Sequence, residues 1–364
     1  IETSDGGNSW EMVNDPSDEG HGTAKRIVFD DPMTSWKSAL GFYNLHFPTS
    51  THGWGVGEMG KIAHTNDGGK NWFGQSTNDP QIDFSNLFGV YFVDANTGWI
   101  VGAGGSIAKT TDGGKAWQVQ SGAFEELRGV FAIDANIAWI VGSQGAIFST
   151  TDGGSSWVLR AAPTRENLYG VSFNDAKTGW VVGENGTILK TADGGSTWQK
   201  LTTGTFTVLQ AVSFVDERHG WLTGEGGLIM VTESGGRSWT KQSNRDTTNN
   251  SLLSVHFDNQ MEGWAVGKAG TVIHSIDGGS TWVDQKGKTA SSLSYLCMLT
   301  SKVGWAAGGN GALIHTTDGG KNWEDRTEDS NAPHSNGMPE PIWGIHFANQ
   351  NIGPLKYTHL TLPT

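Results

Sequence analysis

One short motif recurs along the chain and limits what the chain can fold into. It reads Thr/Ser-x-Asp-Gly-Gly-x-x-Trp and is called the box below. From Trp72 to Trp323 the box tryptophans follow one another at steps of 45, 40, 41, 41, 43 and 41 residues. A period of this length indicates stacked supersecondary units that share one core. Full copies occupy residues 3–10, 65–72, 110–117, 150–157, 191–198, 275–282 and 316–323, and a copy with Ser234 in place of the aspartate occupies 232–239.

Two further patterns precede each box and divide the repeat into strands. Gly-Trp-x-Val-Gly-x-x-Gly-x-Ile occurs, for example, at 98–107 and 179–188, and Leu-x-x-Val-x-Phe precedes it at 87–92 and 168–173. The second pattern alternates with the period of a β-strand. Glycine, aspartate and asparagine separate the segments, as turns require. Each unit of about 40 residues therefore predicts four short strands, the size of one β-propeller blade.

The box itself predicts a folding device. Its glycine pair supplies backbone angles closed to other residues, and its aspartate can accept backbone N–H bonds across the turn. Its tryptophan packs between neighbouring sheets, where burial contributes about 4–6 kcal/mol as an upper estimate. Equivalent positions around a ring point apart, so we predict no catalytic role for them. The predicted structural residues are Asp5, Asp67, Asp112, Asp152, Asp193, Asp277, Asp318, Trp10, Trp72, Trp117, Trp157, Trp198, Trp239, Trp282 and Trp323.

The two ends of the chain decide the predicted number of blades. Seven units are complete, spanning about 39–330. Residues 1–10 supply the end of a third strand, a box and a fourth strand, and residues 342–353 supply a first strand and the start of a second. Joined, these halves would complete an eighth blade and close the ring, which removes exposed sheet edges. We predict an all-β propeller of eight four-stranded blades; seven blades, with the extra strands outside the ring, is the alternative.

The predicted domain is one propeller over residues 1–353, with an insertion at 11–38. Residues 357–364 resemble the in-frame translation of a sequencing adaptor. We therefore expect 354–364 to be a non-native or disordered tail and the chain to be a fragment, with an ordinary divergent tail as the alternative.

Composition limits the class of partner. The formal net charge of −13 argues against DNA, RNA and anionic membrane surfaces, which all attract basic proteins. No apolar run approaches the ~18 residues of a membrane helix. The 17 tryptophans imply a packed interior and exclude disorder. Cys297 is the only cysteine, so an intrachain disulfide is impossible. We predict a monomer with no cofactor and no membrane span.

The combined pattern resembles the Asp-box (BNR-type) propellers of the photosystem II stability and assembly factor family, fully over about 39–330 and partly at both ends. The resemblance implies a secreted, periplasmic or thylakoid-lumenal protein. Plant and cyanobacterial members are assembly chaperones that bind a reaction-centre subunit precursor, and they are described as using an arginine-rich patch. This chain has eight arginines, widely spread, with Arg160 and Arg165 as the only near pair. We expect a bacterial homologue that acts as a non-catalytic, extracytoplasmic binding scaffold, with photosystem II assembly proper as an alternative.

The connections between blades are the predicted binding surface, because variable loops on a rigid scaffold commonly carry function. In propellers one face carries the fourth-to-first connections and the second-to-third turns. The longest connections are 73–86, 240–251 and 324–341, and the insertion 11–38 joins them. We expect a protein or cell-surface partner there; solvated linker without a ligand is the alternative. The candidate residues are Trp36, Asp79, Asp83, Arg160, Arg165 and Arg245.

Two chemical alternatives remain open at this point. Some glycoside hydrolases carry the same boxes, and they need two carboxylates ~5–10 Å apart, for which acidic loop residues such as Glu125 and Glu166 are available. The first strands also carry imidazole and thiol groups of the kind that bind zinc. Equivalent atoms on neighbouring blades stand too far apart for a ~2 Å ligand shell unless they lie near the axis, so we predict packing and no metal. These strand residues are His46, His256, Cys297 and His346.

Overall fold

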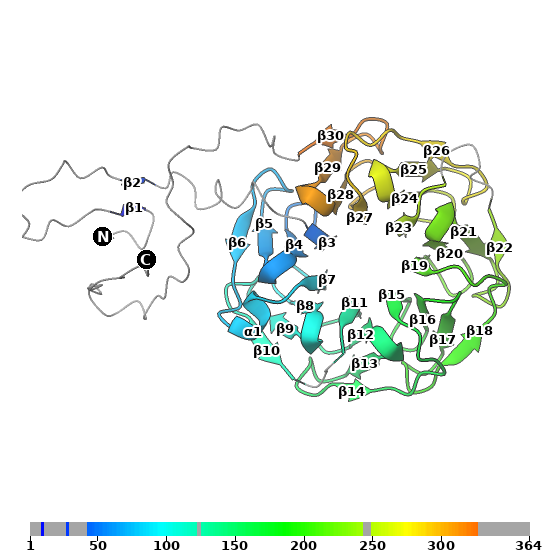
Figure 1. Cartoon of the computed structure of the whole chain (residues 1–364), viewed down its shortest axis with the longest axis horizontal. Coiled ribbons are helices and arrows are strands. Elements are labelled where there is room, and N and C mark those ends of the chain that lie inside the picture. Colours follow the sequence, from blue (N-terminus) through cyan, green and yellow to red (C-terminus); the bar gives the residue numbers. More distant parts are fainter. Residues whose placement is uncertain (1–8, 11–26, 29–41, 122–124, 243–248, 327–364) are drawn as a thin grey trace, which may run out of the picture. The chain divides into compact units, whose positions relative to one another are not determined.

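The computed structural model describes residues 9–10, 27–28, 42–121, 125–242 and 249–326. Residues 36–328 form one compact unit. Within it, seven four-stranded antiparallel sheets surround a central opening, with the first strand of each sheet innermost (Figure 1). Separately, β1 (Ser9–Trp10) pairs antiparallel with β2 (Ile27–Val28).

Each blade consists of four strands that are consecutive in the chain. Blade 1 contains β3 (Phe42–His46), β4 (Gly53–Gly57), β5 (Ile62–Thr65) and β6 (Phe73–Gln75). Blade 2 contains β7 (Leu87–Phe92), β8 (Gly98–Gly102), β9 (Ile107–Thr110) and β10 (Gln118–Gln120). Blade 3 contains β11 (Leu127–Ala132), β12 (Ala138–Gly142), β13 (Ile147–Thr150) and β14 (Val158–Leu159). Blade 4 contains β15 (Leu168–Phe173), β16 (Gly179–Gly183), β17 (Ile188–Thr191) and β18 (Gln199–Leu201).

The remaining three blades repeat this order. Blade 5 contains β19 (Leu209–Phe214), β20 (Gly220–Gly224), β21 (Ile229–Thr232) and β22 (Thr240–Lys241). Blade 6 contains β23 (Leu252–Phe257), β24 (Gly263–Gly267), β25 (Val272–Ser275) and β26 (Val283–Asp284). Blade 7 contains β27 (Leu293–Met298), β28 (Gly304–Gly308), β29 (Leu313–Thr316) and β30 (Glu324–Asp325). One short helix, α1 (Pro80–Asp83), lies between blades 1 and 2, and 3-10 turns between second and third strands include η2 (Glu58–Gly60) and η4 (Ser143–Gly145).

The all-β propeller of four-stranded blades is confirmed, but the predicted number of eight blades is wrong. The structure has seven, which was the alternative. Strands β27 and β28 of the last blade pack directly against β3 of the first, so no further blade fits between them. Of the two half-units, only residues 9–10 are described; 1–8 and 342–353 lie outside the described residues.

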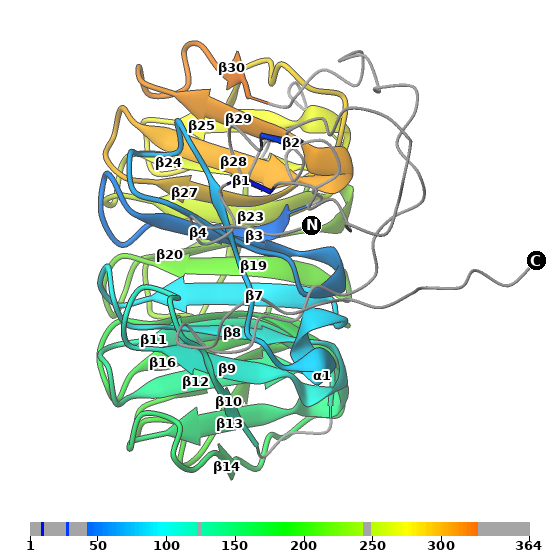
Figure 2. The ribbon, with the colours of Figure 1, turned by 90° about the vertical axis from the view of Figure 1, so that its left-hand side faces the viewer.

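The ring has two distinct faces (Figure 2). Helix α1 and η2 pack together at one of them, which carries the fourth-to-first connections and the second-to-third turns; it is called the connection face below. The first-to-second turns and the boxes lie at the opposite ends of the strands, on the box face. The boxes and the connections between blades therefore lie on opposite faces of the ring.

A stacked aromatic pair joins each of several blades to the next. Trp180 of β16 stacks on Phe214 of β19 with 3.6 Å between ring centroids, and the box residue Trp239 meets the same phenylalanine edge-on at 6.0 Å. The seven second-strand tryptophans are at most 1% exposed, so the apolar core lies between the blades. The other pairs at 3.6 Å are Trp54–Phe92, Trp139–Phe173 and Trp221–Phe257.

The ring closes through the same kind of contact. Phe47, which follows β3, stacks on Trp305 of blade 7 with ring planes 7° apart, at a wider centroid separation of 6.1 Å. Among the described strands, each of blades 1 and 7 is built from four strands that are consecutive in the chain.

The second-strand tryptophans also tie each blade to the next box by hydrogen bonds. Four of them donate Nε1–H to the carbonyl of the first box glycine in the following blade. The bonds run from Trp139 to Gly194 (2.9 Å), Trp180 to Gly235 (3.2 Å), Trp221 to Gly278 (2.8 Å) and Trp264 to Gly319 (3.1 Å).

Inside the box, the aspartate closes the turn by accepting several hydrogen bonds. Asp193 Oδ1 accepts from the Thr191 hydroxyl and from the Thr197 N–H, each at 2.8 Å, and its Oδ2 accepts from the Thr197 hydroxyl at 2.6 Å. Gly195, at a φ of 85° that favours glycine, donates its N–H to the Thr191 hydroxyl. In the box without an aspartate, Ser234 Oγ takes over the N–H bond at 3.0 Å.

The tryptophan bond to the next box gives a first prediction. Trp221 and Trp54 each stack on a phenylalanine of the next blade at 3.6 Å, so replacing either by phenylalanine removes the same ring volume. We expect this loss of packing to lower the free energy of unfolding by about 1–3 kcal/mol in both variants. Trp221 also loses its bond to Gly278, whereas Trp54 Nε1 has no acceptor among the described residues. We expect Trp221→Phe to cost about 0.5–1.5 kcal/mol more in urea unfolding; an equal or larger loss in Trp54→Phe would contradict this.

The box carboxylates give a second prediction, on pH. The Thr197 hydroxyl and N–H, with Thr191, lower the pKa of Asp193 to about 2 from 3.8. Because the folded-state pKa is lowered, the stabilisation is complete above about pH 4 and is lost as the pH falls towards 2. We expect Asp193→Ser, which imitates the natural Ser234 box, to be less stable than wild type at pH 7. This difference should shrink between pH 4 and 2 in denaturant titrations; a constant difference would refute the assignment.

Candidate functional site

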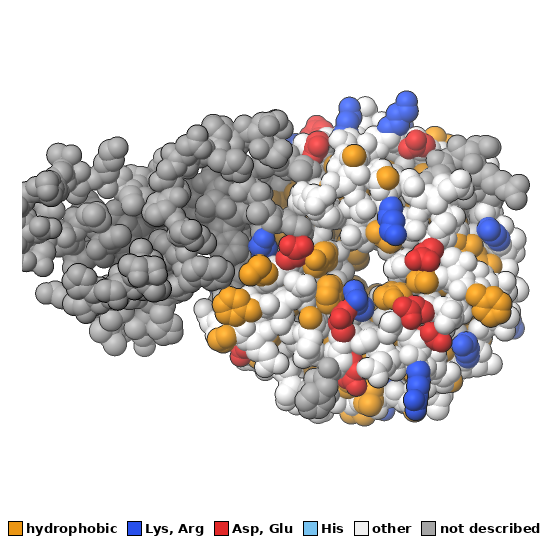
Figure 3. Space-filling model, in the orientation of Figure 1, with side chains coloured by type: hydrophobic (Ala, Val, Ile, Leu, Met, Phe, Trp, Pro, Cys, Tyr) orange, Lys and Arg blue, Asp and Glu red, His pale blue; other side chains and the backbone are white. Residues whose placement is uncertain are grey.

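The connection face carries an arc of aromatic and cationic side chains around the central opening. They stand at the second position of the first strands of blades 1 to 4. The Tyr43 and Phe88 ring centroids lie 5.5 Å apart, and the Arg128 guanidinium lies 4.5 Å from the Phe88 centroid and 6.0 Å from that of Tyr169. Figure 3 shows orange and charged side chains around this opening. The arc therefore combines apolar surface with a cation stacked between two rings.

The carboxylates at this rim are bound by neighbouring side chains. Tyr43 donates its hydroxyl to Glu58 at 3.0 Å, and Tyr169 donates to Glu184 at 2.6 Å. The Tyr169 bond lowers the pKa of Glu184, while burial and this same partner raise the pKa of Tyr169 to about 12. Glu126 forms an ion pair with Arg128.

A hollow of about 410 Å³ lies in blade 3 on the same face, and both members of the predicted arginine pair line it. Arg160 and Arg165 come from the connection that follows β14, and Gln144 and Gly145 come from the turn after β12. Arg160 donates Nε–H to Ser149 at 2.8 Å, which fixes the base of its guanidinium. Arg128 belongs to the first strand of this blade and does not line the hollow.

The predicted candidates Asp79 and Asp83 hold their own connection together. Asp79 caps α1 by accepting the Gln81 N–H at 2.8 Å. Asp83 accepts bonds from the hydroxyls of Ser76 and Thr77 at 2.7 and 2.6 Å. Their oxygens therefore stabilise the loop by hydrogen bonds within it. The exposed apolar residues beside them are better candidates for contact with a partner.

The sequence did not lead us to predict these exposed apolar residues as part of a binding surface. Phe84 is 68% exposed and ends α1, and Met59 is 55% exposed at the tip of η2. Phe206, in the connection between blades 4 and 5, is 89% exposed. A signal for Met59 exists in the sequence, because the equivalent turn positions of the other repeats carry Gly, Gln, Asn or Ala.

Some predicted residues cannot be placed. Asp5, Trp36 and Arg245 lie outside the described residues, as do most of the insertion 11–38 and the tail 354–364. The side chain of Trp10 also lies outside them, although its backbone belongs to β1.

The first-strand imidazole and thiol groups are packed near the centre of the ring. His46 Nδ1 accepts the Phe92 N–H at 3.2 Å, its ring lies 4.2 Å from that of Tyr91, and burial lowers its pKa to about 3. Burial raises the pKa of Cys297 to about 11. His256 Nε2 lies 2.9 Å from Asp258, whereas His346 lies outside the described residues. Among the described side chains, no group of three or more His, Cys, Asp or Glu is placed to hold a metal ion.

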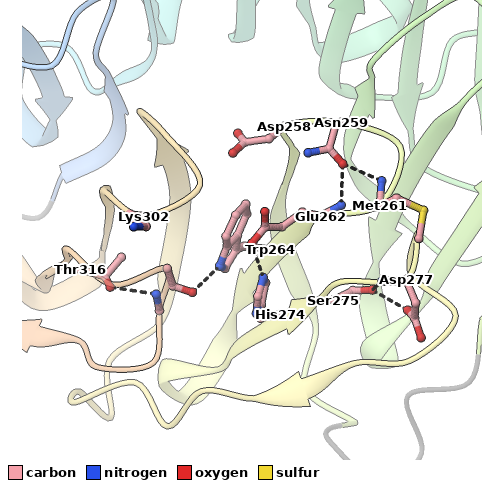
Figure 4. Close-up of polar contacts among 12 residues, drawn as sticks. Asp258, Asn259, Met261, Glu262, Trp264, His274, Ser275, Asp277, Lys302 and Thr316 are labelled. Carbon is pink, nitrogen blue, oxygen red and sulfur yellow. Dashed lines mark hydrogen bonds and ion pairs between the residues drawn. The ribbon is translucent and has the colours of Figure 1, made fainter.

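The box face is built from turns whose polar groups serve the fold (Figure 4). Asn259 Oδ1 accepts the N–H groups of Met261 and Glu262 at 2.8 and 3.0 Å. The Glu262 carboxylate lies 3.3 Å from His274, whose ring stacks on Trp264 at 4.6 Å. These contacts join the turn to the aromatic core of blade 6.

A second hollow, of about 470 Å³, opens on the box face between blades 5 and 6. Asp216 and Asp258 line it. His219 lies 2.8 Å from Asp216, and Gln260 donates to the same carboxylate at 2.9 Å. Asp216 thus links the turns of blades 5 and 6, and Asp258 is paired with His256. Because both carboxylates have partners within the ring, the connection face is the better candidate for a binding surface.

None of the helices in the described ranges could cross a lipid bilayer.

Comparisons with known proteins agree with the arrangement of the ring. The chain matches the model of the family described as photosynthesis system II assembly factor YCF48 at residues 32–159, 156–207 and 198–289. A sequence comparison with curated proteins finds no match.

Solved structures share the fold. A structure of YCF48 bound to a D1 peptide matches at a TM-score of 0.66 and 23% identity, covering 77% of this chain and 92% of that one. YCF48 from Cyanidioschyzon merolae matches at 0.65 and 24%, covering 77% and 96%. The GH74 enzyme of Niastella koreensis matches at 0.63 and 16%, covering 77% of this chain and 53% of the enzyme.

The family matches together extend from residue 32 to residue 289, more than half of the chain, and they confirm the resemblance seen in its motifs. The chain belongs to the family of photosystem II assembly factors typified by YCF48.

Proposed function

We propose that this chain is a non-catalytic scaffold that holds an extended, acidic segment of a partner protein on its connection face. The observation that carries the proposal is that Arg160 and Arg165 line one hollow of blade 3 in a chain whose net charge is −13, with Arg128 on the first strand of the same blade. Guanidinium groups bind carboxylates through charge-assisted, often bidentate, hydrogen bonds. Arg128 is paired with Glu126, whereas the hollow is lined by Arg160 and Arg165 and by one carboxylate, that of Glu125. The excess of positive charge in the hollow favours an anionic segment there.

The family supports the same kind of partner. The YCF48 relative has been seen bound to a D1 peptide, and photosystem II assembly proper is the version of the proposal in which D1 is the partner. The proposed location outside the cytoplasm rests on the family resemblance alone.

The rim carboxylates favour binding over hydrolysis. A glycosidase acid needs a raised pKa so that it is protonated near neutrality. The bond from Tyr169 instead lowers the pKa of Glu184, and Glu126 is paired with Arg128. The likeness to the GH74 enzyme at 16% identity shows the fold alone.

The proposal predicts an effect of charge at the hollow of blade 3. We expect Arg160→Gln combined with Arg165→Gln to weaken binding of the D1 peptide at least about tenfold, because each lost bond to a carboxylate contributes about 1.5–3 kcal/mol. Titration calorimetry measures this, with a D1 peptide whose acidic groups are replaced by amides as the ligand control.

Arg237→Gln is the matched protein control. Arg237 belongs to a box and donates to the Ser234 carbonyl on the opposite face, so its loss should leave peptide affinity unchanged. Equal weakening in both variants, or none in the double variant, would overturn the arginine site. Failure of wild type to bind the D1 peptide would exclude D1 as the partner.

A further inference from the structure

Two large apolar side chains that are exposed to solvent, Met59 and Phe84, belong to segments that pack against each other, η2 and the end of α1. They are 55% and 68% exposed on the connection face. Single exposed apolar residues are ordinary on protein surfaces, but a contiguous exposed group marks an interaction site. Figure 3 shows orange side chains over the region of α1 and, separately, others beside the central opening.

The backbone segments that carry the two side chains are hydrogen-bonded to each other. The Gly60 N–H donates to the Ser85 carbonyl at 2.6 Å, and the Met59 N–H donates to Asn86 Oδ1 at 3.2 Å. A side chain at Gly60 would collide with the backbone of Asp83, so glycine permits this close approach. Asp83 in turn fixes the loop through its bonds to Ser76 and Thr77 described above. Hydrogen bonds therefore hold the backbone segments of Met59 and Phe84 in a fixed arrangement.

The conformation of Met59 gives an independent indication. Its φ of 51° and ψ of 47° place it in the left-handed region, where a residue with a large side chain costs folding free energy. Ala269 and five glycine, asparagine or glutamine residues occupy this conformation in the other repeats: Gly104, Gln144, Asn185, Gly226 and Asn310. Folding gains little from a methionine that remains exposed, so its presence points to a contact made with a partner.

A short stretch of chain leads from the apolar pair to the aromatic residues beside Arg128. Phe88 lies four residues after Phe84, at the second position of the inner strand β7, where its ring lies next to Tyr43 and the Arg128 guanidinium. An extended segment bound on the connection face could contact blade 3 and, farther along, the junction of blades 1 and 2 where Met59 lies. This arrangement fits a segment that combines an acidic group with a large apolar residue.

We propose that Met59 and Phe84, with Tyr43 and Phe88 beside them, form an apolar subsite for a large hydrophobic side chain of the partner segment. The inference rests on the proposed function, because it assigns a second contact to the same bound segment. Affinity then depends on two anchors, a carboxylate at blade 3 and an apolar side chain at the junction of blades 1 and 2.

Peptide selection tests the subsite without knowledge of the natural partner. A phage-displayed library of random dodecapeptides is selected on three forms of the chain: wild type, Met59→Asn with Phe84→Ser, and Arg160→Gln with Arg165→Gln. Wild type should enrich peptides with an acidic group and a large apolar residue at a fixed separation. The Met59 and Phe84 variant should keep the acidic preference, lose the apolar one, and bind the wild-type peptide at least about tenfold more weakly.

Controls separate this inference from the proposed function. Met261→Asn removes a methionine that is equally exposed, at 55%, but lies on the box face, and Phe206→Ser removes an exposed ring from another sector of the connection face; both should bind as wild type. Asn185 and Asn310 occupy the equivalent turn position in two other blades. We therefore expect the Met59→Asn substitution to leave the midpoint of thermal unfolding unchanged. Apolar enrichment that survives in the Met59 and Phe84 variant would overturn the subsite, whereas apolar enrichment without acidic preference in wild type would overturn the arginine site alone.

Discussion

The packing of a buried tryptophan of one blade against the next blade holds the ring together, and at four junctions its partner is a phenylalanine stacked face to face. At a centroid separation of 3.6 Å, Trp180 and Phe214 exclude water from both sheets at once. The Trp180 Nε1–H bond to Gly235 then couples this stack to the following box. Each blade therefore buries its apolar face only when its neighbour is in place, which is the condition for a cooperative repeat structure.

The junction between blades 2 and 3 shows how the same demand is met when the aromatic partner is missing. Ala132 stands where other blades have the phenylalanine. Lys109 lies 4.6 Å from the Trp99 centroid, and its ammonium donates to the Gly153 carbonyl at 3.1 Å, the acceptor that a tryptophan uses elsewhere. At this junction the Lys109 ammonium lies over the Trp99 ring, where other junctions have a phenylalanine, and it also makes the bond to the box carbonyl. Lys190 makes the same two contacts with Trp180 and with the Gly235 carbonyl, there beside an intact stack on Phe214. At the junction of blades 6 and 7, Met298 stands at the phenylalanine position.

Sequence reasoning located the repeats and their strands because glycine, aspartate and tryptophan carry local information about turns and packing. It failed on the number of blades. Residues 1–10 and 342–353 have the pattern of half-blades, but closure depends on the packing of β3 against β27 and β28, which no local pattern encodes. The arginines illustrate the same limit: Arg128 and Arg160 are distant in the chain, and the fold of blade 3 brings them to one face. Asp79 and Asp83 were predicted as binding residues because they are charged, although their oxygens accept hydrogen bonds within the loop. Phe84 could be identified only from its solvent exposure in the structure.

The most direct test of the account is hydrogen–deuterium exchange of the wild-type chain, free and saturated with a peptide selected on it. Binding across the connection face of blades 1 to 3 predicts slowed exchange in residues 56–62, 80–90, 125–130 and 158–168, with the boxes unchanged. Slowed exchange confined to the boxes, or to the connections of blades 5 to 7, would contradict the placement of the partner segment on this surface.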